Sequence, residues 1–445
     1  MQTESVHGRT QPAGKTVGVG LLGCGVVGQE VARLLLENPE RYGARVGAPV
    51  VLRAIAVRDP ARDRGLDPTL FHATGDHVVD HPDIQVVVEV MGGVHPALEL
   101  ILRALRNGKH VVTANKEVIA KHGREIFEAA AESGVEVYFE GSVGGGIPII
   151  MPLKRGLVAN AIQSVSGIIN GTTNYILTRM AREGLPFAEV LAEAQRLGYA
   201  EADPTADVGG HDAANKLAIL ASIILDERLH VDEVHREGIE RITPQDIAYA
   251  RDLGYAIKLL GLAKRVGDRL EVRVHPTMIP FSHPLARIDG VTNAITVQGD
   301  AVGTVTFSGP GAGGMPTASA VVGDVLNLAE ALQRPSGANR LMSGPRRSAQ
   351  PPLSMGEIAS AYYLRLIAED LPGVLGALGT TFGTHGVSIR SFVQKEVVDG
   401  RAELVFVTHQ VQEQRLMDAL AEAKVLPALR EVANLIRVEE PIDGR

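Results

Sequence analysis

The sequence of 445 residues contains a single cysteine, Cys24, and no tryptophan. One cysteine excludes an intramolecular disulfide and any metal site built from several thiolates. No apolar run reaches the roughly 20 residues that a membrane-spanning helix needs, so no membrane partner is expected. Basic residues are also outnumbered, because 44 Lys and Arg stand against 52 Asp and Glu. Binding to nucleic acid is therefore not expected, since phosphate contacts need clustered Lys and Arg.

The length predicts about two or three globular domains. Residues 1–15 are polar and lack the apolar core of a signal peptide, which predicts a disordered tail and a cytoplasmic protein. Residues 333–356 contain four prolines and no periodicity, so this segment is expected to be a linker.

The first half of the chain alternates short Val/Ile-rich runs with helical patterns, which is typical of a parallel sheet covered by helices. Strands are expected at residues 17–22, 50–57, 84–90, 110–113 and 135–139. These elements predict an α/β, Rossmann-type domain over residues 16–140, completed by a late helix within about residues 310–332. Residues 141–309 carry longer strand patterns between helices, which predicts a second, α+β domain with a mixed sheet. Beyond the linker, residues 357–445 follow the order β-α-β-β-α-β of a ferredoxin-like unit.

A glycine pattern, G-x-G-x-x-G, joins the first strand to the first helix. It consists of Gly23, Cys24, Gly25, Val26, Val27 and Gly28. In this context the pattern predicts a dinucleotide site at the helix N-terminus, although a glycine-rich turn without a ligand would show the same letters. At the end of the next strand, Arg58 favours the 2′-phosphate of NADP, and Asp59 leaves NAD possible.

Two lysines are candidates for polarising a carbonyl oxygen. Lys216 lies four residues after Asp212 at the start of an apolar helix, and the preceding loop is rich in carboxylates. A surface ion pair is the alternative interpretation of this spacing. Lys116 follows the strand at 110–113, where ligands bind in open α/β sheets, and an ordinary helix-start lysine is the alternative. Cys24 lies in the phosphate loop, so neither a zinc site nor a thioester mechanism is expected.

Several segments make the chain resemble homoserine dehydrogenases. They are TANK at 113–116, EGSVGGGIP at 140–148, GIINGTTNYIL at 167–177, LGYAEADPTADVGGHDAANKLAIL at 197–220 and GPGAGGMPTASAVVGD at 309–324. The tail from Tyr362 resembles an ACT domain, the amino-acid-sensing module. With no aspartate-kinase domain before it, the chain resembles the monofunctional members of the family.

The resemblance implies NAD(P)H-dependent reduction of L-aspartate 4-semialdehyde to L-homoserine, on the route to threonine, methionine and isoleucine. It implies that Lys216 donates the proton to the carbonyl oxygen, with Lys116 beside it. The implied substrate-binding residues are Glu201, Asp207, Asp212, Tyr199, Thr172 and Lys116. Gly198 and Gly311 are expected beside the cofactor, where Lys116 would also lie.

The resemblance further implies a monovalent cation, sodium, held mainly by backbone carbonyls at Glu140, Val143, Gly145 and Ile147. A plain strand-to-helix turn is the alternative for this glycine-rich loop. Residues 141–309 would also form a dimer interface, and either a homodimer or a homotetramer is expected. Threonine is the expected effector of the ACT-like tail. Two other functions remain open: a non-catalytic regulator that senses NAD(P) and an amino acid, and a dehydrogenase for another amino-acid carbonyl.

Overall fold

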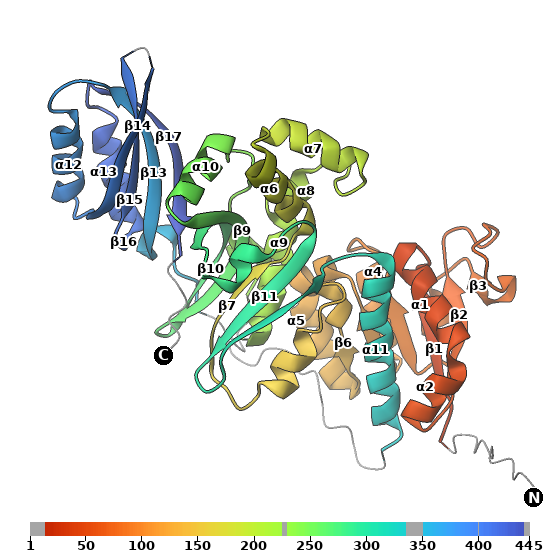
Figure 1. Cartoon of the computed structure of the whole chain (residues 1–445). Helices are drawn as coiled ribbons and strands as arrows, with labels where there is room; N and C mark the ends of the chain where they lie inside the picture. The colour runs from red at the N-terminus through yellow and green to blue at the C-terminus, as the bar shows by residue number, and fades with distance from the viewer. Residues whose placement is uncertain (1–13, 225–228, 335–349, 399, 440–445) are drawn as a thin grey trace, which may run out of the picture. The chain divides into compact units, whose positions relative to one another are not determined.

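The computed structural model describes residues 14–224, 229–334, 350–398 and 400–439. The chain forms two compact units (Figure 1). The first combines Met1–Lys154 with Ala312–Gly344, and the second combines Arg155–Gly311 with Pro345–Arg445. Most of the predicted tail and most of the predicted linker lie outside the described residues.

The first unit is built on a six-stranded parallel sheet of order β3-β2-β1-β4-β5-β6. Its strands are β1 (Val17–Leu22), β2 (Val50–Ala56), β3 (Phe71–His72), β4 (Val86–Glu89), β5 (His110–Thr113) and β6 (Val137–Tyr138). Its helices are α1 (Val26–Glu37), α2 (Pro39–Val46), α3 (Asp76–Val79), α4 (Ala97–Arg106), α5 (Lys116–Ser133) and α11 (Gly314–Leu332). This order is that of a dinucleotide-binding fold, so the prediction of a Rossmann-type domain is confirmed.

The strand order reverses at β1, because β2 lies on one side of it and β4 on the other. Ligands of open α/β sheets bind at such a switch point, beyond the carboxyl ends of the strands. The late helix α11 packs against α1. A Cβ added to Gly314 would lie 2.9 Å from Cγ1 of Val26, so glycine permits this close approach.

The second unit contains a mixed sheet of order β12-β11-β7-β9-β10-β17-β13-β15-β14. Its strands are β7 (Ile162–Ile168), β8 (His235–Arg236), β9 (Tyr255–Val266), β10 (Arg269–Pro280), β11 (Thr292–Gly299), β12 (Gly303–Pro310), β13 (Ala359–Glu369), β14 (Ile389–Val398), β15 (Arg401–Thr408), β16 (Val411–Gln412) and β17 (Leu429–Val438). Its helices are α6 (Gly171–Glu183), α7 (Phe187–Arg196), α8 (Thr205–Val208), α9 (His211–Ile224), α10 (Pro244–Asp252), α12 (Val374–Thr384) and α13 (Glu413–Ala423).

The C-terminal part of this unit has the predicted β-α-β-β-α-β order, with four antiparallel strands arranged β17-β13-β15-β14. Helices α12 and α13 cover one face of the four strands, and Phe382, Phe406 and Leu416 are buried between them. The sequence did not predict that this sheet continues into the neighbouring one. Strand β17 pairs in parallel with β10, at Thr277↔Arg437 and Met278↔Val438.

Candidate active site

Lys216 and Asp212 form a buried ion pair on the first turns of α9. The Lys216 Nζ donates to Asp212 Oδ2 at 2.7 Å and to the carbonyl oxygen of Ile169 at 2.8 Å. The two side chains are only 10% and 8% exposed, so the pair lies inside the protein rather than on its surface. The apolar run after Lys216 buries this helix, because Leu217 through Ala221 are all in the core. A lysine held in this way presents its charge at one fixed position.

Asn170 joins the two acidic positions of this segment. Its Nδ2 donates to Asp207 Oδ1 at 2.7 Å and to Asp212 Oδ2 at 3.0 Å. Its Oδ1 accepts from the backbone N–H of Thr173 and caps α6. The sequence analysis did not select Asn170. Its position directly before the Gly171–Glu183 helix is the signal that was available, since Asn is favoured at such caps.

The loop between α7 and α8 carries Tyr199 and Glu201, two of the other predicted substrate residues, and Thr172 lies on α6. Thr172 Oγ1 donates to the carbonyl oxygen of Tyr199 at 2.7 Å, and the Tyr199 ring lies 4.9 Å from the ring of Tyr175. These contacts fix the loop to α6. Glu201 is exposed, and its backbone carbonyl accepts from Gln195. Asp207 is joined to Asp212 through Asn170, and no such link to Glu201 is seen among the described residues.

The glycine loop in the first unit has the shape that a pyrophosphate requires. Gly23 has a φ of 97°, and its N–H donates to the carbonyl oxygen of Ala56. Gly25 is the N-cap of α1, has no side-chain cap and would have open space around a Cβ. A Cβ at Gly28 would lie 2.3 Å from the carbonyl oxygen of Gly23. The three glycines thus form the turn, leave the helix N-terminus accessible and permit close packing, which fits a bound dinucleotide.

The residues beyond β2 bear on the choice between NADP and NAD. Arg58 and Asp59 are both exposed. One carboxylate oxygen of Asp59 accepts from the N–H of Ala61 at 3.1 Å, so Asp59 is engaged in a local turn. Arg64 lies over the ring of Phe71. Burial raises the pKa of the Cys24 thiol, and the charge of Arg64 lowers that pKa by a smaller amount. The carbonyl oxygen of Arg64 also accepts from Gln29 Nε2 of α1 at 2.9 Å, so a second arginine, missed in the sequence, lies beside the helix that follows the phosphate loop.

Lys116 begins α5 at the carboxyl end of β5 and is half-buried. The neighbouring Asn115 caps the helix and donates to the carbonyl oxygen of Gly93 at 2.7 Å. Glu89, at the end of β4, is fully buried and accepts from Thr113 Oγ1 at 2.6 Å and from the N–H of Met91 at 2.8 Å. Burial raises the pKa of Glu89, and these hydrogen bonds act in the opposite direction. This network makes the strand ends next to the glycine loop rigid.

The loop after β6 is buried and contains left-handed glycines, with φ of 72° at Gly144 and 58° at Gly145. The Glu140 carboxylate accepts three backbone N–H groups, from residues Ile149, Ile150 and Met151, at 2.6–2.8 Å. The side chain of Glu140 is thereby held against the backbone of residues 149–151. Among the described residues, no group of three His, Cys, Asp or Glu side chains could hold a metal.

Gly311 follows β12 and is buried against Asn293 of β11. A Cβ at Gly311 would lie 1.9 Å from the Asn293 Nδ2, so a larger residue requires the Asn293 side chain to move. The Asn293 amide is itself only 1% exposed and has no hydrogen-bond partner among the described residues. Gly198, in contrast, is exposed and left-handed, with a φ of 76°.

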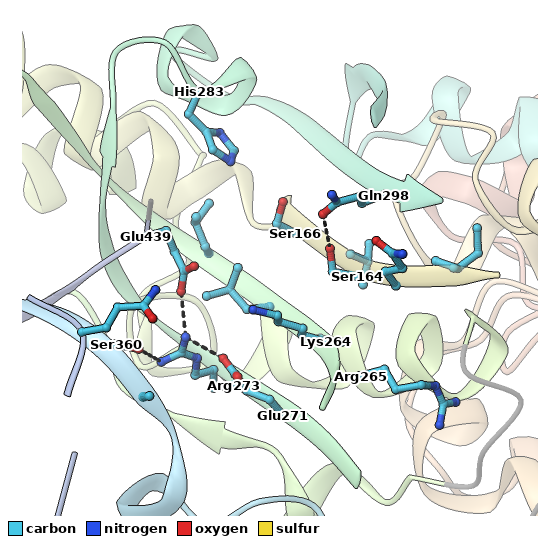
Figure 2. Close-up of a pocket in the computed structure, with 18 of the residues that line it drawn as sticks. Ser164, Ser166, Lys264, Arg265, Glu271, Arg273, His283, Gln298, Ser360 and Glu439 are labelled. Atoms are coloured by element: carbon cyan, nitrogen blue, oxygen red, sulfur yellow. Dashed lines mark hydrogen bonds and ion pairs between the residues drawn. The ribbon is translucent and has the colours of Figure 1, made fainter. Parts of the chain in front are cut away.

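A cavity of about 730 Å³ opens elsewhere in the second unit, over strands β7, β9 and β10 (Figure 2). Its lining includes Ser164, Ser166, Lys264 and Arg273, but none of the predicted site residues. The buried lysine therefore marks the candidate active site better than the size of this cavity does.

Comparison with known proteins decides the family. Family models match residues 148–326 (homoserine dehydrogenase), 23–140 (homoserine dehydrogenase, NAD binding domain) and 362–428 (ACT domain). The homoserine dehydrogenase of Synechocystis sp. is 47% identical over 95% of this chain and 99% of its own length. The chain belongs to the homoserine dehydrogenase family. Its Rossmann-type domain, mixed-sheet domain and ACT domain are those predicted.

Other homoserine dehydrogenases agree with this assignment. The enzyme of Pseudomonas aeruginosa is 46% identical over 96% of this chain and 99% of its own. The crystal structure of a homoserine dehydrogenase from Thiobacillus denitrificans superimposes with a TM-score of 0.90 at 44% identity, covering 96% and 99% of the two chains. A hyperthermophilic archaeal homoserine dehydrogenase in complex with NADPH has a TM-score of 0.60 at 26% identity over 73% of this chain. The chain is thus an oxidoreductase with a nicotinamide-cofactor domain, and the interpretation as a non-catalytic sensor is not supported.

Proposed function

We propose that this homoserine dehydrogenase reduces L-aspartate 4-semialdehyde to L-homoserine, with Lys216 as the proton donor. The observation that carries the proposal is the buried Lys216, held by Asp212 and the Ile169 carbonyl. The assignment of roles to individual residues follows from this geometry together with the family's motifs. A dehydrogenase for a different amino-acid carbonyl is the alternative that substrate screening would separate.

The nicotinamide cofactor, when bound, supplies the hydride that reaches C4 of the aldehyde. Lys216 Nζ transfers its proton to the carbonyl oxygen as negative charge develops there, which gives the alcohol. Asp212 and the Ile169 carbonyl hold the ammonium group in place before the transfer. The deprotonated amine then regains a proton from solvent, and the lysine returns to its starting state.

The carboxylates of the α7–α9 segment suit the positively charged amino group of the substrate. Glu201 and Asp212 are assigned to this group, and Asp207 supports Asp212 through Asn170. Thr172 and Tyr199 shape the same loop through their mutual hydrogen bond. Lys116 is assigned to the site from the end of β5, beside the cofactor.

NADP is proposed as the preferred cofactor, with NAD as the alternative. Arg58 is exposed after β2 and Arg64 lies near the glycine loop, so both are suited to a 2′-phosphate. Asp59 is engaged with the N–H of Ala61, which weakens its candidacy for the ribose hydroxyls of NAD. The pyrophosphate would lie on residues 23–28, with Gly198 and Gly311 also assigned to the cofactor.

A sodium ion is proposed in the glycine-rich loop, with ligands from Glu140, Val143, Gly145 and Ile147. The occupied Glu140 carboxylate and the two left-handed glycines support carbonyl rather than side-chain ligation. The ACT domain is proposed to bind threonine as a feedback inhibitor, and ACT units are proposed to pair in a homodimer or homotetramer. The described residues contain no helix that is both long and apolar enough to cross a membrane. A cytoplasmic location stays a prediction.

The decisive experiment is cofactor-dependent turnover of the wild-type chain and of Lys216→Ala. We expect oxidation of NADPH with aspartate semialdehyde, at a higher kcat/KM than with NADH. Lys216→Ala is expected to lower kcat by roughly 10²–10⁴-fold, the range of general acid catalysis, while NADPH binding by fluorescence is unchanged. Wild-type turnover in the variant would exclude Lys216 as the proton donor, and absence of any turnover in the wild type would favour another carbonyl substrate.

A further inference from the structure

Strand β10 has one edge that two different parts of the chain share. Residues Arg273 and Val274 pair in parallel with β8, and Thr277 and Met278 pair in parallel with β17 of the ACT domain. Both strands lie opposite β9, which occupies the other edge of β10 along its whole length. Strands β8 and β17 therefore follow one another along the same edge of β10.

Arg437 bridges these two strands with its side chain. This residue of β17 is 3% exposed; its Nε and Nη2 donate to Glu413 at 2.7 and 2.6 Å, and its Nη1 donates to Glu237 at 2.9 Å. Glu237 directly follows β8 and also contacts His235 at 2.9 Å. Burial by itself raises the pKa of Glu237, but the His235 contact and the Arg437 charge together lower that pKa to about 2. The Glu237–Arg437 pair is thus ionised throughout the working range of an enzyme.

A second arginine, Arg273, connects β10 to the ACT domain from the side of β10. Arg273 of β10 is 2% exposed and donates to Ser360 Oγ of β13 at 3.0 Å and to Glu439, just beyond β17, at 2.7 Å (Figure 2). The ACT domain is therefore attached to β10 by main-chain pairing and by buried arginines from both sides. A single substitution at this junction therefore leaves the other contacts of the domain in place.

The backbone around Glu237 touches the segment that carries the acidic site residues. The N–H of Ile239 donates to the carbonyl oxygen of Val208, the last residue of α8, at 2.9 Å. A Cβ at Gly238 would lie 2.4 Å from that same oxygen, and one at Gly210 would lie 3.3 Å from the Glu237 carbonyl. Gly210 in turn accepts the N–H of Ala214 and so starts α9. Asp207 precedes this contact by one residue, and Asp212 follows Gly210 by two.

We propose that Glu237 is a positioning residue through which the ACT domain sets the geometry of the α8–α9 segment, and with it the affinity for the amino-acid substrate. The route runs from Arg437 to Glu237, through the 237–239 backbone to Val208 and Gly210, and on to Asp207 and Asp212. The proposal rests on the proposed function, because it assigns these two carboxylates to the substrate side of the site. The affinity for the amino-acid substrate is expected to change, and the KM for the cofactor is expected to stay the same.

The test compares Glu237→Ala with a matched variant, Glu403→Ala. Glu403 is also a carboxylate of this junction, and it accepts from Arg365 and from Tyr249 of α10. Each substitution leaves its arginine with one buried carboxylate: Glu413 remains for Arg437, and Asp246 remains for Arg365. The two variants therefore remove comparable contacts. Glu237 differs from Glu403 in that the backbone following it, at Ile239, donates a hydrogen bond to Val208 of α8.

We expect Glu237→Ala to raise the KM for homoserine on the order of three- to tenfold, with kcat and the KM for NADP⁺ within about twofold. Glu237→Gln, which restores an acceptor for Arg437, is expected to recover most of the affinity. Glu403→Ala is expected to keep the wild-type KM. An equal rise of KM in both alanine variants, or none in Glu237→Ala, would overturn the proposal.

Hydrogen exchange gives a readout that does not depend on the reaction. In Glu237→Ala the amides of Ile239 and Ala214 are expected to exchange faster than in the wild-type chain, and in Glu403→Ala they are expected to keep their protection. Faster exchange without turnover in the wild type would support the coupling and contradict the proposed function. Unchanged exchange in Glu237→Ala, from an active enzyme, would contradict the coupling alone.

Discussion

The side chain of Asn170 has two roles that one substitution can separate: its oxygen caps α6, and its N–H groups donate to Asp207 and Asp212. Asn170→Asp keeps an oxygen that caps α6, because Asp and Asn are equally good caps. It removes the N–H donors to Asp207 and Asp212 and places a third carboxylate beside them. The change therefore acts on the two aspartates while leaving the helix start intact.

The magnitude follows from the two lost contacts. A hydrogen bond to a charged group contributes about 1.5–3 kcal/mol, and about 1.4 kcal/mol corresponds to a factor of ten in rate. We expect kcat/KM for homoserine to fall on the order of 10–100-fold at alkaline pH, because only part of this energy differs between the free enzyme and the transition state. Neighbouring carboxylates raise the pKa of a new carboxyl group, and its protonated form donates a hydrogen bond again. The variant should therefore recover activity, relative to wild type, as the pH falls.

The assay is kcat/KM for homoserine oxidation at saturating cofactor, measured from acidic to alkaline pH. Asn174→Asp is the control, because Asn174 lies on the same helix but donates to the carbonyls of Ile288, Gly290 and Thr292. The control should lower Tm without adding an acid-dependent recovery of activity. A wild-type pH profile in Asn170→Asp, or the same recovery in the control, would refute the reasoning.

Two further substitutions test packing and pH dependence. Gly311→Ala should lower the free energy of unfolding by about 1–3 kcal/mol, since its Cβ would overlap the Asn293 amide, and adding Asn293→Ala should restore part of the loss in denaturant titrations. Burial lowers the pKa of His283 to about 4, and its Nδ1 accepts the N–H of Leu285. As the pH falls, His283 is protonated in the unfolded chain before it is protonated in the folded one. The contribution of His283 to the free energy of unfolding should therefore decrease by about 1.4 kcal/mol for each pH unit from pH about 6.5 down to about 4, and it should be constant above pH about 6.5. His283→Asn keeps a capping acceptor and should remove this part of the acid sensitivity; an unchanged slope in the variant would show that other groups cause it.

Much of the fold could be predicted because its strands are continuous apolar runs. Strands β1 and β5 were predicted at their observed bounds. Helix α2 was missed because its PERYGARV sequence contains a glycine and few apolar residues, and it depends on Tyr42 and Val46 for burial. Strand β12 was missed although Val305 and Phe307 alternate with polar residues, because glycines and prolines at its ends resemble a loop.

The site was predictable where function depends on residue type and unpredictable where it depends on pairing between distant strands. The Asp212–Lys216 spacing predicted their contact, since residues four apart share one helix face. Nothing in the sequence marks the pairing of Thr277 with Arg437, which are 160 positions apart along the chain and meet over two residue pairs. Glu237 was missed for the same reason, because it acts through Arg437, which is 200 positions away in the sequence.

The first unit includes α11, which lies far along the chain, so during translation this unit becomes complete only after most of the second unit has been synthesised. The sheet β1–β6 is finished by Tyr138, but the helix that covers α1 starts at Gly314, and the carboxylate of Asp324 accepts the N–H of Glu140. Until the ribosome has passed residue 332, the α1 surface against which α11 packs stays exposed. The nucleotide-binding unit is therefore the first to begin folding but cannot finish before the second unit's central strands have been made. Interrupting the gene after residue 154 would yield a fragment without its last helix, whereas a fusion of residues 14–154 to 312–334 would restore it.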